Sequence, residues 1–232
     1  SEDYGQKWKS IATNIPTAAV NVIVEDSLNP SILYIGTDNG LYISFNRGEN
    51  WQPFMNGLPP VAVHDLVIQA EAHDLIVGTH GRSIYKVNLK SVQQLNEETI
   101  NSALKIFAVE TVLYSSNWGS SWSKWFKPNE PKLVVDYYTK NQGEVLVQVL
   151  NEIGIVVFEE KQMATSGINQ WTYMVEISKS GAEKWHKKDK KLILKEAKNG
   201  KTYLIPGKYQ IKMTQKSYSQ STPLNIIRNE KN

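Results

Sequence analysis

The stretch "SFNRGENW", residues 44–51, has a counterpart at the start of the chain, "SEDYGQKW", residues 1–8. A serine, an Asp or Asn, a glycine and a tryptophan occupy the same places in both octets, and each matched pair is 43 residues apart. The matched positions are Ser1 and Ser44, Asp3 and Asn46, Gly5 and Gly48, and Trp8 and Trp51. Repeats of this length are typical of propeller blades, which are small antiparallel sheets.

Each residue type in the octet suits a tight turn between strands. Glycine adopts positive φ at little cost, and an Asp or Asn before it can accept hydrogen bonds from turn amides. The tryptophan that follows can pack its large face into the core of a sheet. These tasks are structural, so Asp3 is interpreted as a turn cap rather than as a catalytic acid.

Short β-type runs surround the octets. They are residues 20–24, 32–36, 41–45, 50–54, 62–68, 74–78 and 83–87, and turn segments such as "DSLNPS" and "TDNG" separate them. These runs amount to the last strand of one blade, one complete blade, and three strands of a final blade. A propeller closes with about four to eight blades. We therefore expect a piece of a longer protein, whose remaining blades, or another chain, complete the propeller.

The motif S-x-D-x-G-x-x-W resembles the Asp-box, or BNR repeat, of sialidases, sortilin-type propellers, xyloglucanases and photosystem II assembly-factor-like proteins. Two segments, "SILYIGTDNGLYISFNRGENW" and "DLIVGTHGRSIYKV", are most similar to the final blades of large bacterial sortilin-like propeller proteins, often labelled glycosyl hydrolases. The resemblance covers residues 1–90 and implies a secreted, periplasmic or cell-surface protein. Asn46 departs from the usual Asp; it keeps an acceptor oxygen and removes the charge.

The sequence does not indicate a catalytic centre in this chain. Glycoside hydrolysis generally needs two facing carboxylates, and no spacing in residues 1–90 selects such a pair. Sialidases group three arginines, whereas this chain has three in total, with Arg47 in a turn and Arg228 near the end. Two function classes remain: a non-catalytic binding or scaffold module, or the accessory end of an extracellular glycoside hydrolase whose carboxylates lie in other blades.

The last blade carries three histidines, His64, His73 and His80, at spacings that match no short metal motif. They are interpreted as hydrogen-bonded blade residues, and no metal or cofactor is expected. His80 and Arg82, within "GTHGRSIY", are candidates for a ligand contact at the propeller face.

Residues 91–130 are expected to form a connector with short helices or extended chain, followed by a tryptophan-rich segment. Trp118, Trp122 and Trp125 have spacings that fit one helical face, although Gly119 and several serines equally fit a loop. Their rings could form a plug between domains, or could contact a glycan or protein partner.

Residues 131–229 contain at least five strand-like runs and predict an immunoglobulin-like or fibronectin-like sandwich. The segments "VLNEIGIVVFEE", "GINQWTYMVEI", "LIPGKYQIKM" and "STPLNII" resemble the Ig-like module, similar to that of flagellar hook-capping proteins, that follows these bacterial propellers. Trp171 lies earlier than the usual tryptophan of that module. The chain as a whole is thus expected to be all-β: a partial propeller of one to two four-stranded blades plus this sandwich.

One insertion in this domain, "EKWHKKDKKLILK", is strongly basic. Basic residues around an aromatic ring can bind phosphate groups, and a solvated hairpin explains the same pattern. The candidate anion-binding residues are Lys184, Lys187, Lys188, Lys190 and Lys191.

The net charge of the chain is only +3, so a nucleic-acid partner is not expected. The sequence has no cysteine and no apolar run long enough to span a membrane.

Overall fold

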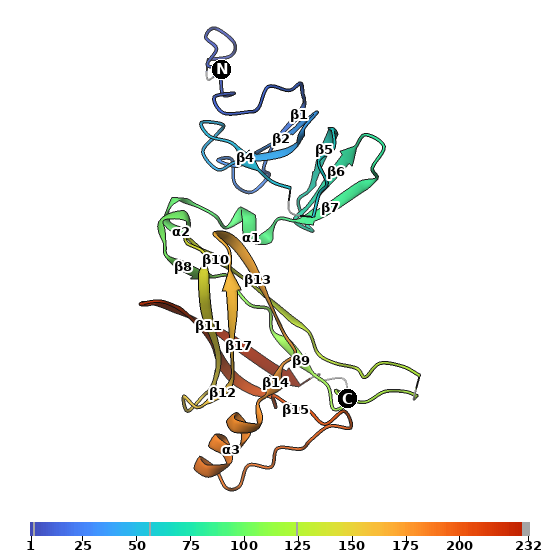
Figure 1. The fold of residues 1–232 in the computed structure, drawn as a ribbon, viewed down its shortest axis with the longest axis vertical. Coiled ribbons are helices and arrows are strands. Elements are labelled where there is room, and N and C mark those ends of the chain that lie inside the picture. The colour runs from blue at the N-terminus through green and yellow to red at the C-terminus, as the bar shows by residue number, and fades with distance from the viewer. Residues whose placement is uncertain (2, 56, 124, 229–232) are drawn as a thin grey trace. The chain divides into compact units, whose positions relative to one another are not determined.

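The computed structural model of this protein describes residues 1–228 apart from residues 2, 56 and 124. The fold is all-β, with several antiparallel sheets and three short helices in the described chain (Figure 1). The chain divides into two compact units, the first ending at Asn96 and the second beginning at Glu97. Residues 97–130, expected as part of a connector, therefore lie in the second unit and contribute two strands to its sheets.

The first unit contains two antiparallel sheets. The four-stranded sheet has the order β1-β2-β3-β4 and the three-stranded sheet has the order β5-β6-β7. Their bounds are β1 Val20–Glu25, β2 Leu33–Thr37, β3 Gly40–Ser44, β4 Gln52–Pro53, β5 Val63–Gln69, β6 Asp74–Thr79 and β7 Ile84–Asn88. Every strand expected from the sequence in this region is present, with ends shifted by at most two residues.

The two sheets of the first unit repeat one irregularity. A β-bulge interrupts the β1–β2 pairing between Val20 and Val22, and another interrupts the β5–β6 pairing between Val63 and Asp65. The two bulges are 43 residues apart, the same period as the octets. The repeat is thus a repeat of backbone geometry as well as of sequence.

A buried cluster of Ile35, Tyr42 and Trp51 forms part of the core of the four-stranded sheet. Ile11 and Ile15, from the segment that follows the first octet, pack against this cluster. The side chain of Trp51 also donates from Nε1 to the carbonyl oxygen of Ile11 at 2.6 Å. The chain after one octet therefore supplies the surface on which the tryptophan of the next octet rests.

A buried carboxylate joins the first sheet to helix α1, Lys90–Gln93. Asp26 accepts hydrogen bonds from the hydroxyl of Tyr34 at 3.1 Å and from Nε2 of Gln93 at 3.0 and 3.2 Å. It also accepts from the backbone N–H groups of Leu28 and Asn29. Burial, together with the nearby Asp26 charge, raises the pKa of Tyr34. Because its oxygens are occupied by these donors, Asp26 acts as an anchor of the fold.

The second unit contains a three-stranded sheet of order β13-β10-β8 and a five-stranded sheet of order β12-β11-β16-β17-β9, in which β9 runs parallel to β17. A short pair, β14-β15, completes its strands. The bounds are α2 Glu97–Asn101, β8 Leu104–Ile106, β9 Val112–Tyr114, β10 Leu133–Thr139, β11 Gly143–Asn151, β12 Val156–Ala164, β13 Gly167–Tyr173, β14 Glu176–Ile177, α3 Lys179–Lys188, β15 Thr202–Tyr203, β16 Gly207–Gln215 and β17 Tyr218–Arg228.

One hydrophobic core draws side chains from both larger sheets of the second unit. Alternate residues of β11 are buried, including Val145, Val147 and Val149, as expected for a strand with one face on a core. From the other sheet, Trp171 and Tyr173 of β13 stack with ring centroids 4.8 Å apart. Trp171 is therefore a core residue, although it lies earlier than the sequence resemblance led us to expect.

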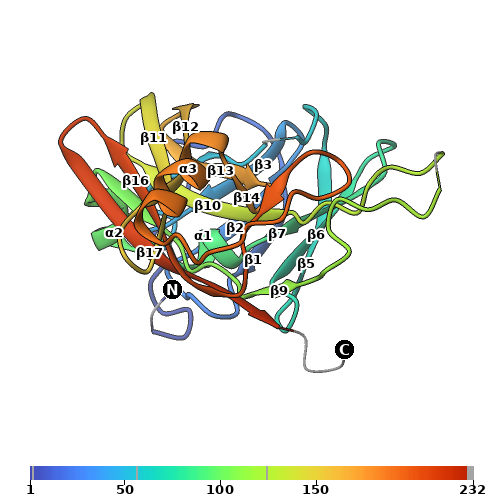
Figure 2. The ribbon, with the colours of Figure 1, turned by 90° about the horizontal axis from the view of Figure 1, so that it is seen from below.

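Helix α3 forms the first part of the basic insertion, residues 183–188, for which a hairpin was considered, and residues 189–195 form a turn and irregular chain. Ser178 caps its first turn by accepting a hydrogen bond from the backbone N–H of Gly181 at 3.1 Å. The Ser178 hydroxyl also donates to the carbonyl of Val157 in β12, and α3 lies beside that strand (Figure 2). The hairpin alternative was wrong because the serine cap and the packing against β12 favour a helix.

Candidate functional site

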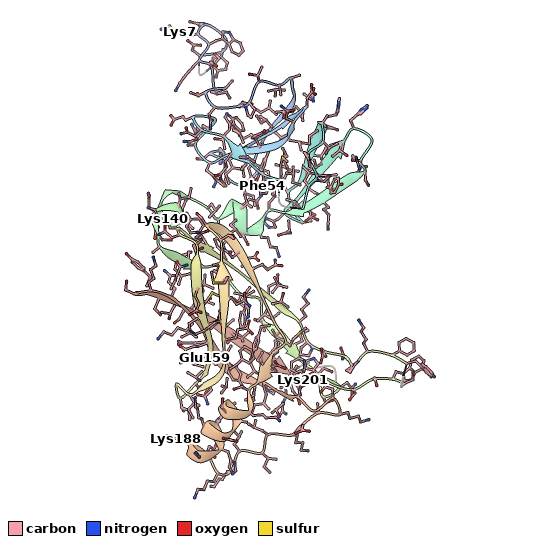
Figure 3. All side chains as sticks on the ribbon, in the orientation of Figure 1. Lys7, Phe54, Lys140, Glu159, Lys188 and Lys201 are labelled. Atoms are coloured by element: carbon pink, nitrogen blue, oxygen red, sulfur yellow. The ribbon has the colours of Figure 1, made fainter. Side chains whose placement is uncertain are left out.

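The first octet forms a closed network of short-range hydrogen bonds. The Ser1 hydroxyl donates to Oδ1 of Asp3 at 2.9 Å and accepts from the backbone N–H of Gly5 at 2.7 Å. Oδ1 of Asp3 in turn accepts from the backbone N–H of Lys7 at 2.8 Å. Figure 3 labels Lys7 in this turn near the N-terminus.

The second octet repeats that network atom for atom. The Ser44 hydroxyl donates to Oδ1 of Asn46 at 3.0 Å and accepts from the backbone N–H of Gly48 at 2.8 Å. Oδ1 of Asn46 accepts from the backbone N–H of Asn50 at 2.9 Å. Since the amide oxygen makes each bond that the carboxylate of Asp3 makes, the change from Asp to Asn preserves the turn.

The electrostatics of Asp3 suit a turn cap. The hydrogen bond from the backbone of Lys7 is the largest influence on its carboxyl and lowers its pKa. A general acid in glycoside hydrolysis needs the opposite, a carboxyl that stays protonated near neutral pH. The geometry therefore gives the octet carboxylate a role in holding the turn.

The two octet tryptophans differ sharply in their surroundings. Trp51 is only 5% exposed, whereas Trp8 is 81% exposed. Trp51 rests on the segment from Ile11 to Ile15, which follows the first octet. Among the described residues none covers Trp8 to a comparable extent, so its ring lies largely open to solvent.

The β-bulges place a polar pair at equivalent positions of the two sheets. In the first sheet, Nδ2 of Asn21 donates to Oδ1 of Asp38 at 2.9 Å. In the second sheet, the rings of His64 and His80 lie with their centroids 5.4 Å apart. Backbone bonds fix both arrangements, because Asp38 N–H donates to the carbonyl of Ala19 and His80 N–H donates to the equivalent carbonyl of Ala62.

A hydrogen bond links these two polar pairs. Nδ2 of Asn21 also donates to the carbonyl oxygen of Val63, the residue before His64, at 3.1 Å. Asn21, Asp38, His64 and His80 are all exposed to solvent. We call these four residues the bulge cluster, and it is the strongest candidate site of the first unit. His80 was expected as a ligand contact from the sequence, whereas its partner His64 could not be paired with it without the register of β5 and β6.

The other two residues considered with His80 lie apart from the bulge cluster. His73 contacts Oε1 of Gln93 through Nδ1 at 2.6 Å, which ties it to helix α1. Arg82 is exposed in the turn between β6 and β7, where Thr79 Oγ1 donates to the Ser83 carbonyl at 2.5 Å. Within the part of the chain that the structure describes, no group of three or more His, Cys, Asp or Glu side chains is arranged for a metal ion.

The tryptophan-rich segment is a loop between β9 and β10 that extends away from the sheets of the second unit (Figures 1 and 2). Two backbone bonds, Gly119 N–H to Asn129 and Asn129 N–H to Ser120, close its base at 2.8 Å each. The single helical face considered for the tryptophans does not form, because the loop consists of turns and bends in its described part.

The three tryptophans of this segment separate into two roles. Trp118 is buried in the core of the second unit, with its ring 5.1 Å from Tyr114 and 5.8 Å from Tyr203. Trp122 and Trp125 are each 94% exposed at the tip, where ring side chains are visible in Figure 3. We call Trp122, Trp125 and the exposed Phe126 the aromatic tip.

The basic insertion also separates into two parts. Trp185 packs edge-on against Tyr209, with ring centroids 6.2 Å apart, so its ring serves the core of the second unit. The lysines proposed for anion binding are exposed on α3 and just after it; Figure 3 labels Lys188 at the helix end. They are Lys184, Lys187, Lys188, Lys190 and Lys191. Trp185 is thus partly buried against the core, whereas the adjacent His186 is exposed with the lysines.

Among the described residues, no helix is both long enough and apolar enough to cross a membrane.

Comparisons with known proteins assign no family to this chain. No family model matches the sequence, and no curated protein matches it. Among solved structures, one similarity is to EmGH1, a β-glucosidase from Erythrobacter marinus, with a TM-score of 0.27 and 11% sequence identity. The match covers 53% of this chain and 15% of the β-glucosidase chain. A similarity at this level carries no argument about fold or function.

Proposed function

We propose that the chain is a non-catalytic binding or scaffold part of a larger secreted or envelope-associated protein. In this proposal the first unit is the end of an Asp-box β-propeller, and the second unit is an Ig-like module. The aromatic tip is the observation that carries the binding function. Solvent-exposed tryptophans on a braced loop serve recognition in many proteins, because each ring offers a large apolar area with few rotatable bonds.

Three features support the propeller assignment. The octets share one hydrogen-bond network, the bulges recur at the octet period, and the first sheet has the simple antiparallel order of a blade. In a closed propeller, Trp8 would rest on a segment equivalent to Ile11–Ile15. We propose that the remaining blades of the same protein, or another chain, supply that segment.

Burial of the Trp8 side chain against such a partner would stabilise the first unit in proportion to the apolar area removed from water. A tryptophan buries about 150–250 Å² when it is fully packed, which is worth several kcal/mol at about 25 cal/mol per Å². Trp8 is 81% exposed and makes little use of that stabilisation in this chain. Packing Trp8 against an added blade would therefore stabilise the first unit substantially.

The shape of the aromatic tip favours a protein or glycan partner. The rings of Trp122 and Phe126 lie 6.3 Å apart with a tilt of 41°, so they present two differently inclined faces. Inclined rings can hold a curved glycan or a protein side chain between them.

The test compares the complete chain with a double variant, Trp122→Ala with Trp125→Ala, on a glycan array and on immobilised bacterial envelope fractions. We expect the unmodified chain to bind at least one surface and the double variant to lose that binding, while its thermal unfolding is unchanged. The matched control is Lys127→Ala, an exposed change on the same loop that leaves the rings in place. Equal binding by the double variant, or no binding by the unmodified chain, would contradict the proposal.

The alternative is the accessory end of an extracellular glycoside hydrolase, with the catalytic carboxylates in other blades. The carboxyl groups whose pKa is shifted here, Asp3 and Asp74, are both shifted downward, which does not suit a general acid. Incubation of the purified chain with polysaccharides separates the two possibilities for this part of the protein. Measurable turnover by the 232-residue chain would overturn the non-catalytic proposal.

A further inference from the structure

We propose that His64 and His80 form a two-histidine site for a late first-row divalent cation, with Zn²⁺ the best fit. Both residues lie in the first unit, one on the bulge of β5 and the other just after β6. Their rings are exposed, so water molecules can supply the remaining ligands. Neutral imidazole is a favoured ligand for zinc, copper and nickel ions.

The distance between the rings fits a shared tetrahedral ion. Zinc lies about 2.0–2.1 Å from a histidine nitrogen, and that nitrogen is about 1.1 Å from the ring centre, so each ring centre would be about 3.2 Å from the metal. If one nitrogen of each ring points at a shared ion, ring centroids 5.4 Å apart correspond to an angle of about 115° at the ion. This value is close to the tetrahedral angle that zinc adopts with nitrogen ligands.

The backbone holds the pair in place before any ion binds. Val63 pairs with Thr79 across the two strands, and the backbone N–H of His80 donates to the carbonyl of Ala62 at 2.9 Å. Both neighbours of His64 are therefore held by strand pairing, and so are His80 and the residue before it. A site with fixed ligands loses less conformational entropy on binding than one built on mobile loops.

Two acidic residues are connected to the histidine pair through the backbone and through Asn21. Asp38 accepts from Asn21, which in turn bonds the carbonyl of Val63 beside His64. Asp65 follows His64 directly, and its carboxylate accepts from the backbone N–H of Leu66 at 2.9 Å. Asp38 is thus linked through Asn21 to the backbone beside His64, and Asp65 is the next residue along the chain.

The first sheet provides the matched comparison for this site. At the same repeat positions it carries Asn21 and Asp38, which bond to each other and offer no imidazole nitrogen. Replacing the histidines by these equivalents, His64→Asn and His80→Asp, should preserve the bulge, because the neighbouring blade already accommodates that pair. The substitutions remove imidazole ligands with little expected effect on the fold.

The experiment uses the complete chain after removal of any purification tag. Co²⁺ is titrated while its visible absorption is recorded, because the intensity distinguishes tetrahedral from octahedral coordination, and Zn²⁺ is then added as the competitor. We expect one equivalent of Co²⁺ to bind in tetrahedral form and Zn²⁺ to displace it. Each single variant should weaken the affinity at least about tenfold, the scale on which loss of even an outer partner weakens metal sites.

Two control variants show whether the bound ion depends on this histidine pair. His186→Gln removes an exposed histidine of α3 and should leave the metal affinity unchanged. Arg82→Gln removes an exposed positive charge two residues after His80 along the chain; it would weaken an anion site but should not weaken a cation site. Loss of Zn²⁺ affinity in Arg82→Gln, or unchanged affinity in both His64→Asn and His80→Asp, would overturn the proposal.

A measurement on the unmodified chain keeps the inference testable if a variant unfolds. Diethyl pyrocarbonate acylates accessible imidazole nitrogens, and mass spectrometry locates the modified residues. We expect Zn²⁺ to protect His64 and His80 together and to leave His186 reactive. Equal modification of His64 and His80 with and without Zn²⁺ would contradict the site.

Discussion

Asn14 holds the backbone of Trp51 through both of its polar atoms. Nδ2 of Asn14 donates to the carbonyl of Trp51 at 2.7 Å, and Oδ1 accepts from its N–H at 2.8 Å. An amide side chain thereby fixes the residue just before β4, the last strand of the first sheet. The tryptophan of the second octet is thus held by the segment that follows the first.

Asn14→Ala should lower the free energy of unfolding of the first unit by about 1–3 kcal/mol, since it removes two hydrogen bonds and leaves two backbone groups without those partners. Asn14→Asp should be at least as harmful at neutral pH, because it places an acceptor against the Trp51 carbonyl. Urea unfolding followed by circular dichroism gives the loss, and amide exchange near Trp51 assigns it. Thr13→Ala, an exposed neighbour, should have little effect; an equal loss there would refute the role of Asn14.

Gly5 and Gly48 provide a matched pair for measuring packing at one turn. Both have positive φ, +87° and +86°, but an added Cβ would meet Ile11 at 2.9 Å at Gly48, and only Trp8 at 3.8 Å at Gly5. Gly5→Ala should cost about 1–2 kcal/mol for backbone strain alone. Gly48→Ala should cost about 1–3 kcal/mol more, because the methyl group overpacks the site. Thermal unfolding of the two variants in parallel measures the difference. Equal losses of stability would show that the Ile11 side chain moves aside to accommodate the methyl group.

Asn46→Asp should leave the stability of the chain within about 0.5 kcal/mol of its original value, since each observed bond to Asn46 Oδ1 can also be accepted by a carboxylate. Asn46→Ala should cost about 1–2 kcal/mol, as loss of a cap does at helix ends. Chemical denaturation at pH 7 distinguishes the two variants. A loss in Asn46→Asp as large as that in Asn46→Ala would mean that the amide group itself is required.

Gly181→Ala should destabilise the second unit, although alanine favours a helix over glycine by about 1 kcal/mol in isolated peptides. In this protein the added Cβ would overlap the carbonyl oxygen of Val157, so α3 could not remain in its place on β12. Ala182 already shows that the next position tolerates a methyl group. The exposed change Lys184→Ala serves as the control, and thermal unfolding measures both. An increase in stability for Gly181→Ala would show that α3 does not pack closely on β12.

Acid should remove a stabilising interaction at Asp74. The hydrogen bond from Lys86, at 3.0 Å, together with that from Asn88, lowers the pKa of Asp74 below its ordinary value of 3.8. Because the folded-state pKa is the lower one, the stabilisation is fully present above the unfolded-state pKa and is lost as the pH falls through the folded-state pKa.

The measurement for Asp74 is the difference in unfolding free energy between the unmodified chain and Asp74→Asn, from about pH 6 to about pH 2. We expect a constant difference at the upper end that shrinks below about pH 4. A difference independent of pH over the whole range would show that the charge of Asp74 does not stabilise the fold.

The sequence predicted the strands of the first unit well because their signals are local. Alternating apolar residues mark the strands, and the bonds of each octet join residues no more than four apart. The repeat then made two independent segments predict the same turn. The same local signals predicted at least five strand-like runs in residues 131–229, where the structure also forms strands.

The helix α3 and the split role of the tryptophans were not predictable in this way. A lysine-rich sequence is compatible with a helix or with a hairpin. The helix forms here because Ser178 caps its first turn and because it packs closely against β12. Trp118 and Trp122 have similar sequence surroundings, yet one is buried and the other exposed. Whether a side chain is buried depends on which segments, distant in sequence, pack against it. The spacing of the tryptophans along the chain does not predict this.

By itself, the sequence determined the repeat, the all-β class and the turn formed by Ser44, Asn46 and Gly48, because each depends on residues that are neighbours along the chain. Only the tertiary structure decided that Trp51 is packed while Trp8 is open, and that His64 faces His80 across a bulge. The physical reason is that strand register and core packing arise between residues far apart in sequence. A shift of one residue in the pairing of β5 and β6 would send the histidine rings to different faces.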